Sequence, residues 1–447
     1  MIETLDALVG LFRQNGSVRI YAKKLAPNDN SKNQVYLGGD FSALNIIPHG
    51  EIETDTSDIA GSVRDRAKAP IRFWWIDEEG RIEAPNAQLI LYPKYPEVRM
   101  SGFLKGAKLN GARSLPADVM RVRDVGRVIF LGITKDGTVL GHAVPAASPL
   151  ASEIQNLGNQ SVTGVFLEVP NGANEGNSKQ QLLTALGVIY RKLWIPSQKL
   201  GADGIPRTYA ARNGGGYTLE AELGIMPNGY ADPDYLGWEI KQYAVNDFVS
   251  FRPTSVVTLM TPEPTGGYYR DSGAESFVRR FGYPDKSGKA GRINFGGVYA
   301  FGKPFHHDTG LQLTTIGFDQ ATNKITDMEG GIALVDRQGE IAALWRFPGI
   351  IGHWSRKHAQ AAYVPSLYQT PPPEYRFGPR ILLCEDTDLT FFMKAVASGL
   401  VYYDPALKIE IENNGRSVMK RRSQFRIKHQ HLRQMYKHNE TVVLHLK

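Results

Sequence analysis

The chain has little cysteine and no long apolar run. Its 447 residues include one cysteine, Cys384, which excludes a disulfide framework and any zinc site built from several cysteines. No apolar stretch approaches the roughly 20 residues that a membrane span needs. The first residues, MIETLD, lack the basic start and apolar core of a secretion signal. We therefore expect a cytoplasmic protein with no membrane partner, and Cys384 as a buried strand residue.

Two further absences narrow the chemistry. No glycine-rich string is followed by Gly-Lys-Ser/Thr, so the sequence does not indicate ATP dependence. His306 and His307 precede Asp308, but adjacent histidines on an extended segment point in opposite directions. No second His/Cys pair stands at zinc spacing. We interpret residues 306–308 as a loop, with His306 as a candidate DNA contact.

Positive charge exceeds negative charge only modestly, but it is concentrated near the end of the chain. Lys and Arg number 52 against 45 Asp and Glu. From residue 416 to residue 438 there are eight Lys/Arg, three His and no acid. Such a segment is either a solvent-exposed surface or a surface that binds the phosphate backbone of a nucleic acid. The candidate DNA contacts here are Arg421, Arg422 and Arg426, and further candidates, or else solvated charges, are Arg279, Arg280 and Arg292.

An acidic motif stands in the middle of the chain. Asp234 is followed by Glu239 and Lys241. Residues 236–243 predict a strand, in which Glu239 and Lys241 project together while the intervening Ile240 points into a core. Two carboxylates and a lysine can hold a divalent cation against a phosphate and activate a water molecule. The same spacing also occurs by chance on solvated strand edges, but here the motif favours a nuclease, with Lys241 acting on the water.

The surroundings of the motif support this interpretation. The block G-Y-T-L-E-x-x-L-G-I-x-x-N-x(5)-D-x-x-G-W-E-I-K, from residue 216 to residue 241, resembles the MvaI/BcnI family of restriction endonucleases. These are relatives of the mismatch-repair nickase MutH in the PD-(D/E)xK superfamily. The resemblance implies Mg²⁺ held by Asp234, Glu239 and the Ile240 carbonyl. It also implies that Glu220, on a short helix, lies beside the metal, although Glu220 is otherwise a helix-surface acid.

Later segments look like other family elements. Residues 354–358 (WSRKH) and 362–364 (AYV) are similar to a W-x-x-K-(H/F)…Y-V element, and residues 391–404 are similar to a helix-to-strand segment. Near the end the family often has an Asp-His-Gly-Thr-Ala-Phe-Arg-like stretch. Residues 420–427 (KRRSQFRI) keep the Phe-Arg part and lack the histidine, which puts the family's base-reading contacts in question here.

Length and linker composition predict two domains. Residues 171–177 (NGANEGN) form a polar Gly/Asn stretch without periodicity, which is typical of a linker. A helix is expected to begin after it, with Ser178 and Gln181 as a capping box and leucines on one face. We therefore predict a DNA-binding domain over residues 1–170 and a nuclease domain over residues 178–447.

The first domain shows many short β-like runs and few helical patterns, which favours a β-pseudobarrel. Residues 23–35 are similar to the start of the EcoRII effector domain, a DNA-binding pseudobarrel, and residues 94–99 stand where that domain has a second basic arm. The alternative is an ordinary surface loop. If this domain reads a C·G base pair, Glu97 accepts a hydrogen bond from the cytosine amino group and Arg99 donates hydrogen bonds to guanine. The candidate DNA contacts are Lys23, Asn28, Asp29, Asn30, Gln34, Lys94, Glu97 and Arg99.

Together these features predict a mixed α+β protein: a β-pseudobarrel followed by a PD-(D/E)xK nuclease domain with a central mixed sheet. The resemblances imply a magnesium-dependent type II restriction enzyme that leaves 5′-phosphate ends. They further imply a monomer acting on a CC(A/T)GG-like site in double-stranded DNA, a cognate methyltransferase, and an effect of a second target copy. The alternatives are a methylcytosine-reading endonuclease, a MutH-like nickase and a catalytically silent repressor.

Overall fold

A computed structural model describes residues 2–30, 34–55, 58–59, 62–63, 66–156, 162–170, 178–211, 213–226, 234–412 and 415–445. The chain divides into two compact units, Met1–Asn177 and Ser178–Lys447. The predicted linker at residues 171–177 lies outside the described residues. The fold is mixed α+β, as predicted from the sequence, and no helix among the described residues is long and apolar enough to cross a membrane.

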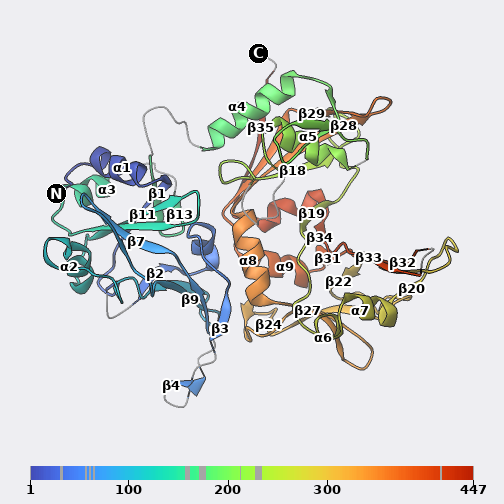
Figure 1. Cartoon of the computed structure of the whole chain (residues 1–447), viewed down its shortest axis with the longest axis horizontal. Coiled ribbons are helices and arrows are strands. Elements are labelled where there is room, and N and C mark those ends of the chain that lie inside the picture. Colours follow the sequence, from blue (N-terminus) through green and yellow to red (C-terminus); the bar gives the residue numbers. More distant parts are fainter. Residues whose placement is uncertain are drawn as a thin grey trace. The chain divides into compact units, whose positions relative to one another are not determined.

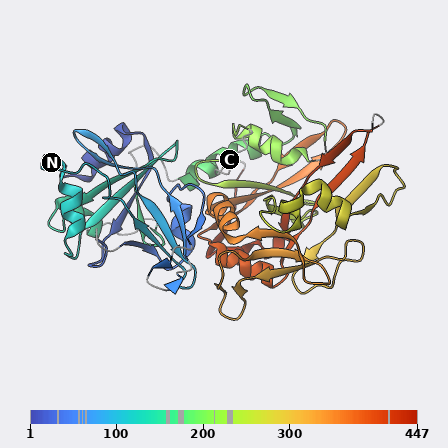
Figure 2. The ribbon, with the colours of Figure 1, turned by 60° about the horizontal axis from the view of Figure 1, so that its bottom comes forward.

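Unit 1, drawn from blue to teal in Figures 1 and 2, contains two principal sheets. The seven-stranded sheet has the order β13 (Val162–Thr163), β14 (Phe166–Val169), β1 (Ser17–Lys24), β11 (Val128–Thr134), β12 (Val139–Val144), β7 (Phe73–Asp77) and β8 (Gly80–Glu83). The five-stranded sheet has the order β2 (Val35–Gly38), β10 (Glu97–Ser101), β9 (Gln88–Tyr92), β6 (Arg66–Pro70) and β3 (Glu53–Asp55). The many short strands expected in this part of the sequence are confirmed. That the sheets form a pseudobarrel stays a prediction.

Two helices of unit 1 pack on the seven-stranded sheet. Helices α1 (Leu5–Gln14) and α3 (Pro149–Asn156) place Leu8, Phe12 and Ile154 in one apolar cluster with strand residues such as Phe130 and Leu140. Strands β11 and β12 are buried along their whole length, as is typical of interior strands covered on both faces. Helix α2 (Leu115–Arg121) follows the second sheet in the chain.

Unit 2 is built on a six-stranded mixed sheet, as predicted. Its order is β15 (Ile195–Pro196), β29 (Glu374–Phe377), β28 (Gln360–Gln369), β30 (Arg380–Glu385) and β35 (His438–Val443), and β18 (Glu239–Ala244) pairs with β28 in parallel. Helix α4 (Ser178–Arg191) buries Leu182, Leu186 and Ile189 against this sheet, which confirms the predicted helical face (Figure 1). Cys384 is buried in β30.

The rest of the described part of unit 2 contains smaller sheets, the short helix α5 (Gly214–Glu222) and four further α-helices. One sheet has the order β19 (Val257–Met260), β34 (Phe425–Ile427), β31 (Val401–Tyr403) and β22 (Tyr299–Ala300). A second has the order β20 (Tyr283–Pro284), β21 (Arg292–Gly296), β32 (Ala406–Ile411) and β33 (Ser417–Lys420). A third contains β23 (Gln312–Ile316), β26 (Gly331–Val335) and β27 (Ile341–Arg346). The four further helices are α6 (Tyr268–Ser272), α7 (Ala274–Phe281), α8 (Phe347–His358) and α9 (Leu389–Ala397).

Candidate active site

The chain reverses direction immediately before β18. Leu236 and Gly237 have φ angles of 50° and 87°, and the flanking Tyr235 and Trp238 exchange two backbone hydrogen bonds of 2.9 and 2.8 Å. Left-handed residues at both central positions are typical of a two-residue hairpin turn. The strand predicted over residues 236–243 was therefore wrong at its start: it begins at Glu239, because residues 236–237 form this turn.

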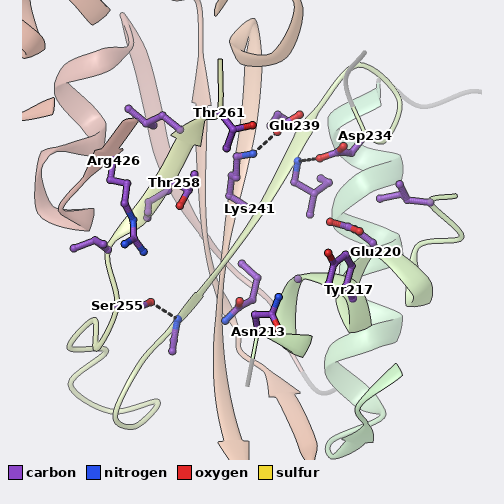
Figure 3. A pocket seen from close by; sticks show the side chains of 18 of the residues that line it. Asn213, Tyr217, Glu220, Asp234, Glu239, Lys241, Ser255, Thr258, Thr261 and Arg426 are labelled. Carbon is purple, nitrogen blue, oxygen red and sulfur yellow. Dashed lines mark hydrogen bonds and ion pairs between the residues drawn. The ribbon is translucent and has the colours of Figure 1, made fainter. Parts of the chain in front are cut away.

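This turn brings the two carboxylates of the motif together. Residues that flank a two-residue turn pair in order, so Asp234 falls opposite Glu239. Asp234 Oδ2 accepts a hydrogen bond of 2.9 Å from the backbone N–H of Ile240, which fixes the side chain against the start of β18 (Figure 3). The four residues between Asp234 and Glu239 therefore form the turn that places the two carboxylates side by side.

One carboxylate oxygen of Glu239 is buried without a hydrogen-bond partner among the described residues. The side chain is 1% exposed, and its Oε1 accepts from Lys241 Nζ. Its Oε2 is that buried oxygen. A buried carboxylate oxygen without a partner is costly. The position therefore favours a further positive group at Oε2.

Helix α5 (Gly214–Glu222) brings Glu220 to the same place (Figure 3). The helix starts with glycines because its first turn is pressed against neighbouring side chains. A Cβ on Gly214 would lie 2.4 Å from Ser197 Oγ, and a Cβ on Gly215 would lie 2.9 Å from the side chain of Gln242 on β18. The glycine-rich entry noted in the sequence therefore serves close packing of α5 on the catalytic strand.

The electrostatics of the cluster show an excess of negative charge. Burial and the nearby Asp234 carboxylate raise the pKa of Glu220 to about 7. Burial and the nearby Glu239 raise the pKa of Asp234 to about 6. Burial also pushes the pKa of Glu239 upwards, but Lys241 and other cations outweigh it and hold this pKa below its usual value. One partly buried lysine, Lys241, does not balance three carboxylates, so a cation is favoured here.

The cluster opens into a large cleft of unit 2 with a volume of about 1330 Å³. Its walls come from α5, β18, β19, α8 and β34 (Figure 3). The polar and charged residues that line it around the acids include Lys199, Asn213, Tyr217, Gln242, Ser255, Thr258, Thr261, His353, Lys357 and Arg426. Such a cleft suits a polyanionic chain rather than a small apolar ligand.

Two cations of the cleft were not among the residues predicted from the sequence. Lys357, on α8, acts electrostatically on both Asp234 and Glu239 and has no ion-pair partner among the described residues. Lys199 lies 4.5 Å from the centre of the Tyr217 ring. The signal for Lys357 was its place in the WSRKH segment.

The next residue of that segment, His358, holds α8 in place. His358 is fully buried and stacks on Trp354 with ring centres 4.1 Å apart. Its Nε2 lies 3.0 Å from the carbonyl oxygen of Leu259, so Nε2 donates, and its Nδ1 lies 3.2 Å from the Tyr436 hydroxyl. Burial lowers the pKa of His358 to about 4, which keeps the ring neutral. Trp354 and His358 thus position Lys357.

The donor set fits a magnesium ion. Among the described residues no three His, Cys, Asp or Glu side chains form a ready-made metal cage. Mg²⁺ is commonly held by one or two carboxylates, with water and substrate phosphates completing its octahedron. Asp234 and the unpartnered Glu239 oxygen supply such a pair, and the Ile240 carbonyl is the third expected ligand. The residues therefore suit Mg²⁺ better than zinc.

Three predicted DNA contacts of unit 1 are buried, which does not fit direct contact with DNA. Lys23 is 4% exposed, and Asp29 and Asn30 are each 2% exposed. Lys23 Nζ donates to Asp29 Oδ2 at 2.7 Å, and the backbone N–H groups of Ala26 and Tyr36 donate to the same carboxylate. These polar side chains bind the loop to the domain instead of facing solvent.

The remaining candidates of unit 1 are more accessible. Asn28 and Lys94 are exposed, and the partly buried Gln34 accepts from the Tyr92 hydroxyl at 2.9 Å. Glu97 and Arg99 form an ion pair of 2.7 Å, so the proposed C·G readout requires this pair to open. The structure brings Glu97 and Arg99 together on β10.

The arginines predicted on loops of unit 2 lie on regular elements and are paired. Arg279 and Arg280 stand on α7, where Arg279 pairs with Glu275 and Arg280 with Glu340. Arg292 stands on β21. His306 lies in the predicted loop, with its ring 5.1 Å from that of Tyr299, and its Nδ1 is buried without a hydrogen-bond partner among the described residues.

The basic C-terminal segment divides between surface and cleft. Arg421 and Arg422 are exposed, and Arg421 lies 4.0 Å from Glu263. Arg426 lines the cleft and donates to Asp404 at 2.5 Å. Of the predicted basic contacts, Arg426 is the one that the structure brings into the cleft with the acids (Figure 3).

A mixed α+β unit that opens two carboxylates and a lysine into a cleft of this size belongs to the class of nucleases. Residues 183–436, more than half of the chain, match the model of the MvaI/BcnI restriction endonuclease family. The chain belongs to this family and is therefore a hydrolase of the sequence-specific, type II-like DNA endonuclease class.

Two solved structures of the restriction endonuclease MvaI are similar to this chain. The complex with cognate DNA substrate has 15% identity and a TM-score of 0.45, and covers 61% of this chain and 100% of that chain. The structure without DNA has 13% identity and a TM-score of 0.35, with the same coverage. No curated protein matches the chain.

Proposed function

We propose that this protein is a Mg²⁺-dependent type II restriction endonuclease that cuts double-stranded DNA and leaves 5′-phosphate and 3′-hydroxyl ends. The observation that carries the proposal is the buried Glu239 oxygen without a partner, placed beside Asp234 and Lys241 at the wall of a large cleft. Family membership supports the substrate class.

In this mechanism Asp234, Glu239 and the Ile240 carbonyl hold the cation. When bound, it polarises the scissile phosphate and lowers the pKa of a water molecule. Lys241, which already donates to Glu239, orients that water for attack on phosphorus. Lys357 stabilises the charge that develops on the phosphate. Glu220, whose pKa is raised to about 7, would accept a hydrogen bond from that water.

The target, partners and assembly form the finer part of the proposal. We propose a CC(A/T)GG-like site, a monomeric enzyme that cuts one strand and then the other, and a cytoplasmic system with a cognate methyltransferase. Base contacts worth about 1–3 kcal/mol each determine such a target. The loss of the family histidine near residue 423 leaves other side chains to supply them.

The decisive experiment digests methylated and unmethylated plasmid with Mg²⁺ and with EDTA, followed by sequencing of the ends. Linear unmethylated DNA with 5′-phosphates, formed only with Mg²⁺, is the expected result. Cleavage of methylated plasmid alone would establish the methylcytosine-reading alternative, and open circles alone the nickase. Specific binding without any cutting would point to a repressor.

For unit 1 we propose an effector role through a second DNA-binding surface. A fragment over residues 178–447 contains all of the cleft residues and is expected to fold and cleave without unit 1. Residues 1–170 are expected to bind a duplex without cutting it. An added oligonucleotide with the target should change cleavage of a one-site plasmid by the full chain and not by the fragment. An inactive, insoluble fragment would instead make unit 1 part of one catalytic body.

A further inference from the structure

Two pairs of strands in unit 2 form one continuous β-ribbon. Tyr402 on β31 lies opposite Arg426 on β34, and Lys408 on β32 lies opposite Lys420 on β33. Between these pairs the two strands are joined by backbone hydrogen bonds of 2.8 Å from Asp404 N to Gln424 O and from Ala406 N to Arg422 O. The register is the same from end to end, so residues 401–411 and 417–427 make one unbroken antiparallel ribbon. Figure 1 shows β32 and β33 leading away from β31 and β34.

The two faces of this ribbon differ in burial. From residue 401 to residue 410 every odd-numbered residue is buried and every even-numbered one is partly exposed. Successive side chains of a strand point to opposite faces, and residues directly opposite each other share a face. With one unbroken register, Lys408 and Lys420 therefore lie on the same face as Arg426, which lines the catalytic cleft. The even-numbered face therefore runs along the ribbon from Arg426, which lines the cleft, to Lys408 and Lys420.

This face carries a cluster of cations. Glu410 is paired with Arg292, whose Nε lies at 2.8 Å, with Lys408 at 3.2 Å, with Lys289 at 3.3 Å and with Lys420 at 3.5 Å. Asp285 adds one more carboxylate at 3.2 Å from Arg292, so four cations face two carboxylates. Like charges directly opposite each other destabilise a sheet. Glu410 contacts both Lys408 and Lys420, but one carboxylate balances only one of these two charges, so the pair leaves excess positive charge on the surface.

We propose that the even-numbered face of this ribbon binds the phosphate backbone of the DNA duplex that occupies the cleft. The inference rests on the proposed nuclease function. From Arg426 to Lys420 the ribbon extends six residues, or about 20 Å. At about 3.4 Å of axial rise per base pair, Lys408 and Lys420 reach phosphates roughly six base pairs from the cleft. Lysines on a rigid ribbon contact phosphates of any sequence, so this surface adds affinity and sets the length of flanking DNA that the enzyme needs.

The test measures binding of labelled duplexes in EDTA as a function of salt, with the target at the centre of duplexes of about 8 and about 30 base pairs. Lys408→Ala/Lys420→Ala in the full chain is expected to weaken binding of the long duplex by about tenfold to thirtyfold at about 0.15 M salt. Its salt slope should fall by about 1.8, because two phosphate contacts are lost. Binding of the short duplex should not change, because that duplex ends before the two lysines.

The control Lys303→Ala/Lys324→Ala removes two exposed lysines of the same unit and should bind both duplexes like wild type. Lys408→Arg/Lys420→Arg keeps the charge and should retain the long-duplex slope, which separates charge from folding. If wild type binds and cuts DNA, and Lys408→Ala/Lys420→Ala binds both duplexes as tightly as wild type does, this inference is wrong and the proposed function stands. Wild type that binds neither duplex would overturn the proposed function. Unchanged DNA binding with an altered oligomeric state would identify a self-association surface instead.

Discussion

Each unit pairs a lysine with a buried carboxylate, and the two pairs differ in how the carboxylate oxygens are used. In unit 1 both oxygens of Asp29 accept hydrogen bonds, from Lys23 Nζ and from backbone N–H groups. In unit 2 one oxygen of Glu239 accepts from Lys241 and the other has no partner among the described residues. A carboxylate whose two oxygens both accept hydrogen bonds indicates a structural ion pair. A carboxylate oxygen without a hydrogen-bond partner at the wall of a cleft indicates a site for a further ligand.

The surroundings of the two pairs support the same distinction. Near Asp29 the added charge is the guanidinium of the fully buried Arg127, which donates to the backbone oxygens of Asp29, Ala26 and Val119. Near Glu239 lie two more carboxylates, Asp234 and Glu220, and burial together with the neighbouring negative charges raises the pKa values of both. The first arrangement is complete without a ligand. The second is balanced only when a cation binds.

The largest expected effect is on cleavage. Glu239→Ala removes the open oxygen, so cleavage with Mg²⁺ should fall by about a thousandfold or more while DNA binding persists. Gel analysis of plasmid digestion and anisotropy of a labelled duplex measure the two properties. Glu222→Gln is the matched control: it lies on α5 outside the lining of the cleft, pairs with Lys192, and should retain activity. Clear cleavage by Glu239→Ala would remove Glu239 from the metal site.

The next effect tests the structural pair. Lys23→Ala leaves Asp29 buried and uncompensated, so the free energy of unfolding of unit 1 should drop by about 3–5 kcal/mol. Urea unfolding of residues 1–170 measures the change. The control is Lys24→Ala, an exposed neighbour on the same strand, which should change stability little. Stability close to wild type, together with lost DNA affinity, would make Lys23 a DNA contact as first expected from the sequence.

A smaller effect concerns Glu220 and depends on pH. Because burial and Asp234 raise its folded pKa to about 7, the ionised form lowers stability above that pH. Glu220→Gln should therefore stabilise the metal-free protein at pH 8 by about 1–2 kcal/mol. The gain should shrink as pH falls through 7 and vanish below about 4.5, where the wild-type side chain is protonated in both states. Urea midpoints at several pH values measure it, and a gain that grows towards acid pH would contradict the assignment.

The sequence predicted that Asp234, Glu239 and Lys241 lie together because the motif is local, and the structure places them in one cleft. Their catalytic role stays a prediction. It missed the turn at Leu236, since leucine disfavours a left-handed backbone and only the adjacent Gly237 hinted at it. It placed Lys23 and Asp29 on the surface, because composition alone does not reveal that two opposite charges are buried together. Such pairing depends on Arg127, which is about a hundred residues away in the chain.

The basic ribbon was only partly visible in the sequence. The basic segment from residue 416 was recognised, and the alternation over residues 401–410 is present in the letters VYYDPALKIE. What the sequence does not contain is the register, which places Lys408 opposite Lys420 and Arg292 opposite Glu410. Tertiary packing of the apolar face determines the register. A slip of the register by one residue would move every side chain of a strand to the opposite face.

The smallest expected effect separates two neighbouring arginines of this ribbon. Arg422 has an even number and lies on the face of Arg426, whereas Arg421 points to the other face and lies near Glu263. Arg422→Ala should lower the magnitude of the salt slope for a long duplex by about one, and Arg421→Ala should leave it unchanged. Each variant is the control of the other, because both remove one exposed arginine from adjacent positions. Equal losses in the two variants would mean that DNA contacts both faces of the ribbon at this point.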